Sequence, residues 1–145
     1  MRAVLTRVTS AEVAVEGHVI GRIGPGLLAL IGVTHSDDER VARSLAAKIA
    51  GIRILRDGDR DESSALQVGA EVLVVSQFTL YADVSHGRRP SWSGAAPGPV
   101  AEPLVQAVLE ELRRLGISAQ SGRFGARMAV SSVNDGPLTI LIDAD

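Results

Sequence analysis

The 145-residue chain contains no cysteine, and aromatic residues make up only 3% of it. The absence of cysteine excludes disulfide bonds, thiolate nucleophiles and cysteine-based metal sites, and it fits a reducing compartment. The aromatic side chains are too few to build the stacking platforms on which proteins read single-stranded nucleic acids. We therefore expect no sequence-specific reading of bases and no binding to DNA.

Histidines and long apolar runs are also scarce. The three histidines, at positions 18, 35 and 86, are too scattered to form a histidine-based metal motif, so we expect neither a metal nor another cofactor. No run approaches the roughly 18 apolar residues of a membrane span, and the start of the chain lacks the apolar block of a signal peptide. We expect a cytoplasmic protein without a membrane partner.

Charge is nearly balanced, with a formal net charge of −2 that gives no overall attraction for nucleic acid. The basic residues are nearly all arginine, and the densest group contains His86, Arg88 and Arg89. Such a group is either a solvated surface loop or a local contact for phosphate. The sequence leaves both interpretations open.

The length and the 46% hydrophobic content are those of a single domain that spans residues 1–145. Apolar and β-branched runs predict strands at 3–8, 13–15, 19–23, 27–33, 52–55, 71–79, 118–121, 128–133 and 138–142. Many strands with two or three helices indicate a mixed α/β protein, in which a curved mixed β-sheet or barrel packs against the helices.

Two helices and two loops are expected between these strands. A stretch of capping-box form, SDDE from Ser36, precedes apolar residues that recur every four positions and predicts a helix over 37–50. A second apolar stripe has prolines near its start and ends before Gly116, a typical residue after a helix. The polar segment 57–69 and the Gly-, Ser- and Pro-rich segment 83–99 are expected to be surface loops.

The common catalytic motifs are missing from the sequence. There is no nucleophile elbow, no evident Ser-His-Asp set and no glycine-rich phosphate loop. What stands out is a buried strand that ends in Ser76, Gln77 and Thr79, three side chains able to form hydrogen bonds. Polar groups at the end of a buried strand are either satisfied structural residues or part of a site.

A second unusual stretch, VNDGPLTILID at 133–143, holds a proline inside what otherwise looks like a strand. Proline cannot donate a hydrogen bond to a sheet ladder, and Asn134, Asp135 and Gly136 ahead of it favour a turn. The simplest interpretation is a hairpin connection at Pro137.

Together, SQFTLYAD at 76–83 and NDGPLT at 134–139 resemble the two signatures of the D-aminoacyl-tRNA deacylases. The resemblance covers nearly the whole chain, through MRAVLTRV at the start, GRIGPGLLALIGV at 21–33, GRRPSWSGAAP at 87–97 and GRFGARMAVSSVNDGP at 122–137. Three places depart from the family pattern, namely Thr6, Leu138 and the segment 61–64.

The resemblance implies the fold of that family and a homodimer whose active sites lie at the subunit interface. In that homodimer, a cis Gly136–Pro137 peptide of each subunit would reach the active site of the other subunit. The catalytic positions that it implies are Ser76, Gln77, Phe78 and Thr79. The positions implied for substrate binding and chiral selection are Gly136, Pro137, Phe124, Met128 and Asn134. Arg7 is expected to lie near the Gly-Pro peptide.

The implied activity is hydrolysis of the ester bond at the 3′ end of D-aminoacyl-tRNA, and of mischarged glycyl-tRNA. We expect the Gly136–Pro137 carbonyl groups to exclude L-aminoacyl esters by crowding, and main-chain N–H groups near Phe78 and Thr79 to stabilise the oxyanion. No evident base accompanies Thr79, so we expect it to position the substrate rather than attack it. The 2′-hydroxyl of the tRNA would then assist the hydrolysis.

Two alternatives to this activity stay open at the level of sequence. The first is an editing deacylase for a mischarged L-aminoacyl-tRNA, in which the Gly-Pro peptide would be trans. The second is a non-catalytic, dimeric RNA-binding domain with the same fold.

Overall fold

The computed structural model describes the backbone of residues 1–145 and every side chain except that of Asp61. The elements, in chain order, are β1 (Arg2–Val15), β2 (His18–Ile23), β3 (Gly26–Gly32), α1 (Glu39–Gly51), β4 (Leu55–Asp57), β5 (Arg60–Ser63), α2 (Ala65–Val68), β6 (Glu71–Ser76), the 3₁₀ helix η1 (Phe78–Tyr81), α3 (Gly98–Arg114), β7 (Ala119–Ser121) and β8 (Met128–Asp143). No helix in the described part is long and apolar enough to cross a membrane.

The main sheet has the strand order β2-β1-β3-β6-β7, and β8 pairs with β1 as well. The pairs β3–β6 and β6–β7 are parallel, whereas β1 is antiparallel to each of its three neighbours. The first half of β1 lies between β3 and β8, and its second half lies between β2 and β8. The two short strands predicted at 3–8 and 13–15 are therefore one continuous strand that spans both parts of the sheet.

The sheet curls until its two ends nearly meet. The Arg22 N–H of β2 donates a hydrogen bond to the Gln120 side chain of β7, with 2.9 Å between nitrogen and Oε1. A Cβ atom at Gly21 would lie 3.1 Å from the Ser121 carbonyl oxygen, so a larger residue there would force β2 and β7 apart. The result is the expected mixed α/β architecture, with a nearly closed, barrel-like sheet and three helices.

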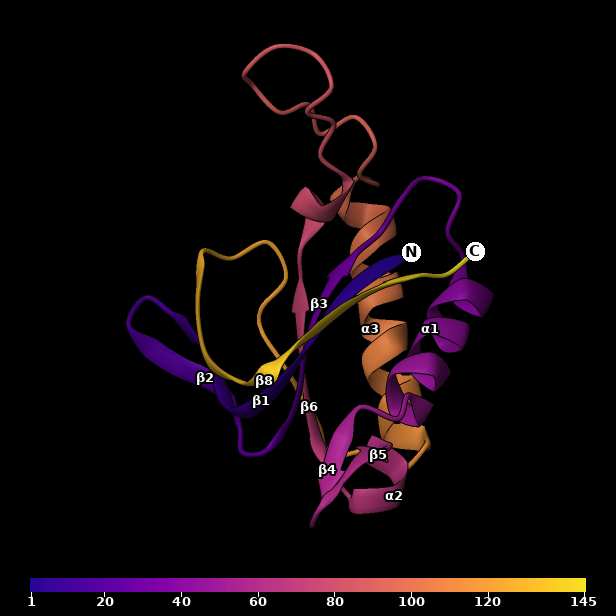
Figure 1. Ribbon diagram of the computed structural model, residues 1–145. Coiled ribbons are helices and arrows are strands. Elements are labelled where there is room, and N and C mark those ends of the chain that lie inside the picture. Colours follow the sequence, from indigo (N-terminus) through magenta and orange to yellow (C-terminus); the bar gives the residue numbers. More distant parts are fainter.

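Helices α1 and α3 lie side by side against the sheet (Figure 1). Their inner faces bury Leu45 and Ile49 from α1 and Val108 and Leu112 from α3 completely. This packing explains the apolar spacing seen in the sequence, because residues four apart share one helix face.

The ends of these two helices test the predicted caps. The N-cap of α1 is Asp38, whose carboxylate accepts a hydrogen bond from the Val41 N–H at 2.9 Å. The capping box predicted from Ser36 is therefore wrong by two residues, because the aspartate nearer to the first turn makes the bond. Gly116 follows α3 with a φ of +92°, as expected of a glycine that ends a helix.

The polar segment 57–69 is not a plain loop, which corrects the prediction. It contributes to a two-stranded hairpin of β4 and β5 and then forms α2. A reciprocal pair of hydrogen bonds between Ser64 and Gln67 caps α2, and Ala65 is fully buried. The strand predicted at 52–55 begins only at its last residue. Local capping and one buried contact thus order a segment whose charge suggested solvent.

The Gly-Pro segment, residues 134–137, is not a hairpin connection either. Strand β8 pairs with β1 on both sides of the segment and in the same antiparallel direction, with register shifts between Thr6 and Val8 and between Val8 and Ser10. The chain therefore bulges at the segment without reversing. The Gly136–Pro137 peptide within it is cis, as the family resemblance implies.

Candidate active site

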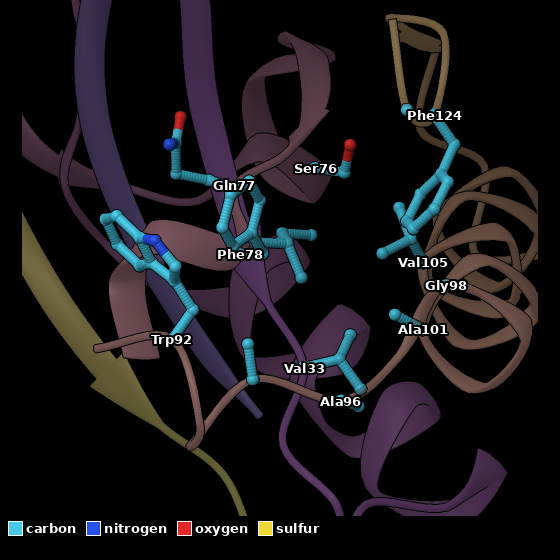
Figure 2. A pocket seen from close by; sticks show the side chains of 13 residues that line it. Val33, Ser76, Gln77, Phe78, Trp92, Ala96, Gly98, Ala101, Val105 and Phe124 are labelled. Carbon is cyan, nitrogen blue, oxygen red and sulfur yellow. The ribbon is translucent and has the colours of Figure 1, made fainter. Parts of the chain in front are cut away.

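A cavity of about 330 Å³ opens where β3 and β6 end. The carboxyl ends of parallel strands are the usual place for ligands in sheets that helices cover. Figure 2 shows its walls, to which the strand ends, η1, the long loop and the start of α3 contribute. The lining residues are Ile31, Val33, Ser76, Gln77, Phe78, Trp92, Ala95, Ala96, Gly98, Ala101, Val105, Phe124 and Gly125.

The walls of this cavity carry no acidic, basic, histidine or cysteine side chain among the residues that line it. The polar side chains in the lining are those of Ser76, Gln77 and the indole of Trp92. Tyr81, which lies in η1 outside the lining, has a hydroxyl whose pKa is raised by burial to about 12, so this group stays protonated at neutral pH. None of the lining side chains can therefore act as a conventional general base.

The end of β6 brings together most of the first signature. Ser76, Gln77 and Phe78 line the cavity, and Phe124 lies on the opposite wall in Figure 2. The predicted strand to Thr79 is too long, because the chain turns into η1 after Gln77. The Gln77 N–H bonds the Ile31 carbonyl oxygen at 2.7 Å, which ties the turn to β3.

Thr79 lies in η1 and does not line the cavity itself. Its hydroxyl oxygen accepts a hydrogen bond from the side-chain amide of Gln77. An amide N–H donates and cannot remove the hydroxyl proton, so this contact orients Thr79 without activating it.

Met128 lines a second cavity of about 250 Å³ on the other side of the Ser76–Phe78 turn. That cavity also touches Gly125, so the two cavities share the turn and the loop before β8. Met128 is therefore near the candidate site but separate from its main cavity within this chain.

Trp92 is a cavity residue that the sequence reasoning did not nominate. Its ring meets that of Phe78 edge to face, with centroids 5.3 Å apart and planes at 72°. Both side chains are about half exposed, at 44% and 55%. In a chain with a single tryptophan, its place in the long glycine- and serine-rich loop was the available signal.

Within one chain, the Gly-Pro segment lies far from this cavity. Its first residue, Asn134, pairs with Val8 of β1. Val8 pairs in turn with Gly26 of β3, and Gly26 pairs with Glu71 of β6. The cavity lies at the other end of β6, at Ser76. Five residues of strand correspond to about 17 Å, so the fold does not bring the two signatures together in the same subunit.

Arg7 contacts the Gly-Pro segment, as expected. Its Nε donates to the Asp135 carbonyl oxygen at 2.9 Å, and its Nη1 donates to the Ile54 carbonyl oxygen at 3.0 Å. The Arg7 side chain is buried, whereas Gly136 and Pro137 are exposed. A Cβ atom at Gly136, whose φ is +142°, would lie only 2.8 Å from the Arg7 guanidinium.

Two further contacts complete this support. The Asp135 carboxylate lies 3.2 Å from Arg56 Nε and 3.5 Å from Arg7 Nε. The Asn134 side-chain amide donates to the main-chain carbonyl of Arg7 at 2.9 Å. Asn134 therefore braces the segment in this chain, and the exposed Gly-Pro peptide is presented on a fixed base.

Solved structures with this fold identify the structural class. One described as a c-Myc DNA unwinding element binding protein matches with a TM-score of 0.91 and 36% identity, over 100% of this chain and 99% of that one. Another, described as a probable eukaryotic D-amino acid tRNA deacylase, matches with a TM-score of 0.86 over 97% of each chain. The second is 16% identical, so it shows a shared fold alone.

Sequence comparisons identify the family within that class. The profile of the family described as D-Tyr-tRNA(Tyr) deacylase matches residues 4–143. The D-aminoacyl-tRNA deacylases of Nocardia farcinica and Kineococcus radiotolerans are each 59% identical over 99% of this chain and 100% of their own length. The chain belongs to the D-aminoacyl-tRNA deacylase family of hydrolases, as its sequence motifs indicated.

The support of the Gly-Pro segment can be tested by removing its buried cation. Arg7→Met keeps an unbranched apolar stem but leaves the Asp135 and Ile54 carbonyl groups without their donor. We expect the free energy of unfolding in urea to fall by about 2–3 kcal/mol and amide hydrogen exchange to accelerate at 134–139. The matched change Arg56→Gln, at a side chain that is 46% exposed, should cost less than about 1 kcal/mol. Equal effects of the two changes would contradict this account.

Proposed function

We propose that this protein hydrolyses the ester bond of D-aminoacyl-tRNA and releases the free D-amino acid and tRNA. The membership of nearly the whole chain in the deacylase family supports this activity. The cavity at the end of β6 supports it independently, because its apolar walls and three polar side chains suit an aminoacylated nucleoside. Mischarged glycyl-tRNA is a second substrate under the same proposal.

The chemistry assigned to this site relies on the main chain. Water attacks the ester carbonyl carbon, the carbonyl oxygen becomes an oxyanion, and the ribose oxygen leaves with a proton. The N–H groups of Phe78 and Thr79 lie in the first turn of η1, where a helix leaves its N–H groups without internal acceptors. One such donor to an oxyanion is typically worth about 10²–10³ in rate.

The proton transfers are assigned to the substrate. No lining side chain of the cavity is a candidate base, and Thr79 receives a hydrogen bond from an amide. The 2′-hydroxyl of the terminal ribose is adjacent to the ester, and positioned acid–base groups contribute about 10²–10⁴ in rate. The RNA thereby supplies the catalytic group that the cavity walls lack.

The separation of the two signatures within one chain supports a site that is shared between two subunits. About 17 Å of strand separates the Gly-Pro segment from Ser76 within one chain. In a two-fold dimer, each copy can place its exposed Gly-Pro segment over the cavity of the other. Exposed apolar side chains along β8, among them Val130, Val133 and Leu141, suit burial between two copies.

Chiral selection is assigned to exclusion by this segment. Carbonyl groups fixed near the substrate Cα would occupy the space of an L side chain and leave that of a D side chain open. Specificity of this kind comes from a clash with the wrong enantiomer rather than from a fitted pocket. It allows many D side chains, and it allows glycine, which has no side chain to reject.

A direct test compares esters of one tRNA that carry either enantiomer of the same amino acid. We expect kcat/KM for the D ester to exceed that for the L ester by roughly 100-fold or more, because a steric clash rejects the L form. Several D side chains and glycine should be accepted. Preferential hydrolysis of L esters would instead indicate an editing enzyme for L-aminoacyl-tRNA. Binding of tRNA without any hydrolysis would indicate an RNA-binding domain.

The role of the RNA can be tested with a tRNA that ends in 2′-deoxyadenosine and carries the D-aminoacyl group on its 3′ oxygen. Loss of the neighbouring hydroxyl should lower kcat by about 10²–10⁴. Competition against the normal substrate measures binding, which should change little. Equal turnover of the two substrates would end the RNA-assisted mechanism.

Heterodimers of differently marked subunits test the shared site. Ala101→Phe fills the cavity, and Gly136→Ala disrupts the Gly-Pro segment against Arg7. With one change in each subunit, one site per dimer stays intact, so about half of the wild-type rate per dimer is expected. With both changes in one subunit and a wild-type partner, the one open cavity faces the altered Gly-Pro segment, so this dimer should still hydrolyse esters but, unlike the first, should lose its discrimination against the L form. The reverse outcome would place both signatures in sites within single chains.

A further inference from the structure

Residues 83–91 form a loop, here called the arginine loop, that projects from the body of the molecule between η1 and α3 (Figure 1). Paired main-chain hydrogen bonds close its base: the Asp83 N–H bonds the Ser91 carbonyl at 2.8 Å, and the Ser91 N–H bonds the Asp83 carbonyl at 2.9 Å. The next residue, Trp92, lines the candidate cavity. The loop therefore starts at the cavity rim and extends away from it.

The outer part of the arginine loop carries two exposed cations, Arg88 and Arg89. Among the described side chains, no carboxylate forms an ion pair with either guanidinium. The acidic residue of the loop, Asp83, stays at its base, where its carboxylate accepts hydrogen bonds from the Ser85 hydroxyl at 2.6 Å and N–H at 2.9 Å. The far end of the loop is thus positively charged.

We propose that the arginine loop binds phosphate groups of the tRNA strand immediately before the aminoacylated 3′ end. The inference rests on the proposed function, which places that end in the cavity beside Trp92. Gly87, at the tip with a φ of +71°, is four residues from each anchor. An extended arm of that length spans up to about 13 Å from the cavity rim.

The chemistry of the loop suits a phosphate backbone rather than bases. Guanidinium groups form bidentate hydrogen bonds with phosphate oxygens, and the loop itself contains no Phe, Tyr or Trp side chain. Contacts to phosphate position a nucleic acid without reading its sequence. Because the whole protein has a net charge of −2, a local cationic arm provides attraction that the overall charge does not.

The test uses the full-length protein with Arg88→Gln and Arg89→Gln together, and two substrates of different size. One is D-aminoacyl-tRNA, and the other is the 3′ D-aminoacyl ester of adenosine, which has no phosphate. We expect kcat/KM for the tRNA to fall roughly 3- to 30-fold at physiological salt, as for the loss of two exposed ion pairs. The rate with the adenosine ester should not change.

Salt dependence and matched variants identify the cause. The slope of log kcat/KM against log salt for the tRNA should become less steep by about 1 for each phosphate that the variant no longer neutralises. Arg88→Lys with Arg89→Lys keeps both charges and should retain most of the salt dependence. Arg40→Gln with Arg43→Gln removes two exposed charges from α1 and should leave the slope unchanged.

The outcomes separate this inference from the proposed function. If the wild-type protein hydrolyses both substrates and the Gln variant matches it on both, the loop does not bind phosphate and the inference fails alone. An equal loss on both substrates also overturns it, because the effect then lies in the cavity. If the wild-type protein hydrolyses neither substrate, the proposed function fails and the inference fails with it.

Discussion

Pairing of β1 with both β3 and β8 is the constraint on which the rest of the structure depends. Through β3, this strand sets the position of β6 and so of the cavity at its end. Through β8, it places the Gly-Pro segment directly over Arg7. Because backbone ladders define the register of every residue along them, one strand determines where both signatures lie and sets the start of the Gly-Pro segment level with the far end of β6 from the cavity.

Because of that separation, the proposed site would combine parts of two subunits. A subunit presents a cavity with no acidic, basic, histidine or cysteine side chain among its lining residues and, elsewhere, an exposed Gly-Pro peptide that Arg7 and Arg56 support. A second copy and the substrate RNA would supply what is missing, so the proposal assigns selection to a partner's main chain and acid–base chemistry to the ribose.

Local patterns in the sequence predicted the helices and strands whose apolar residues are buried at regular spacing. The apolar periodicity of α1 and α3 corresponds to one buried face of each helix, and the apolar runs of β3 and β6 correspond to strands that are buried along most of their length. Predictions were wrong where composition or a motif did not show which hydrogen bonds form, whether these are local, as in the helix caps, or distant, as in the pairing of β8 with β1. Asp38 replaces Ser36 as the cap of α1, the charged segment 57–69 folds into β4, β5 and α2, and the expected hairpin at Pro137 is a bulge within β8.

The sequence by itself determined the family, the mixed α/β class and the residues at the end of β6, because motifs and hydrophobic periodicity are local properties of the chain. Only the tertiary structure showed that Trp92 and the start of α3 join Ser76 and Phe124 around one cavity. It also decided that the Gly-Pro segment lies far from that cavity and rests on Arg7. Strand register and sheet curvature set these distances, and both arise from pairings between residues far apart in the chain.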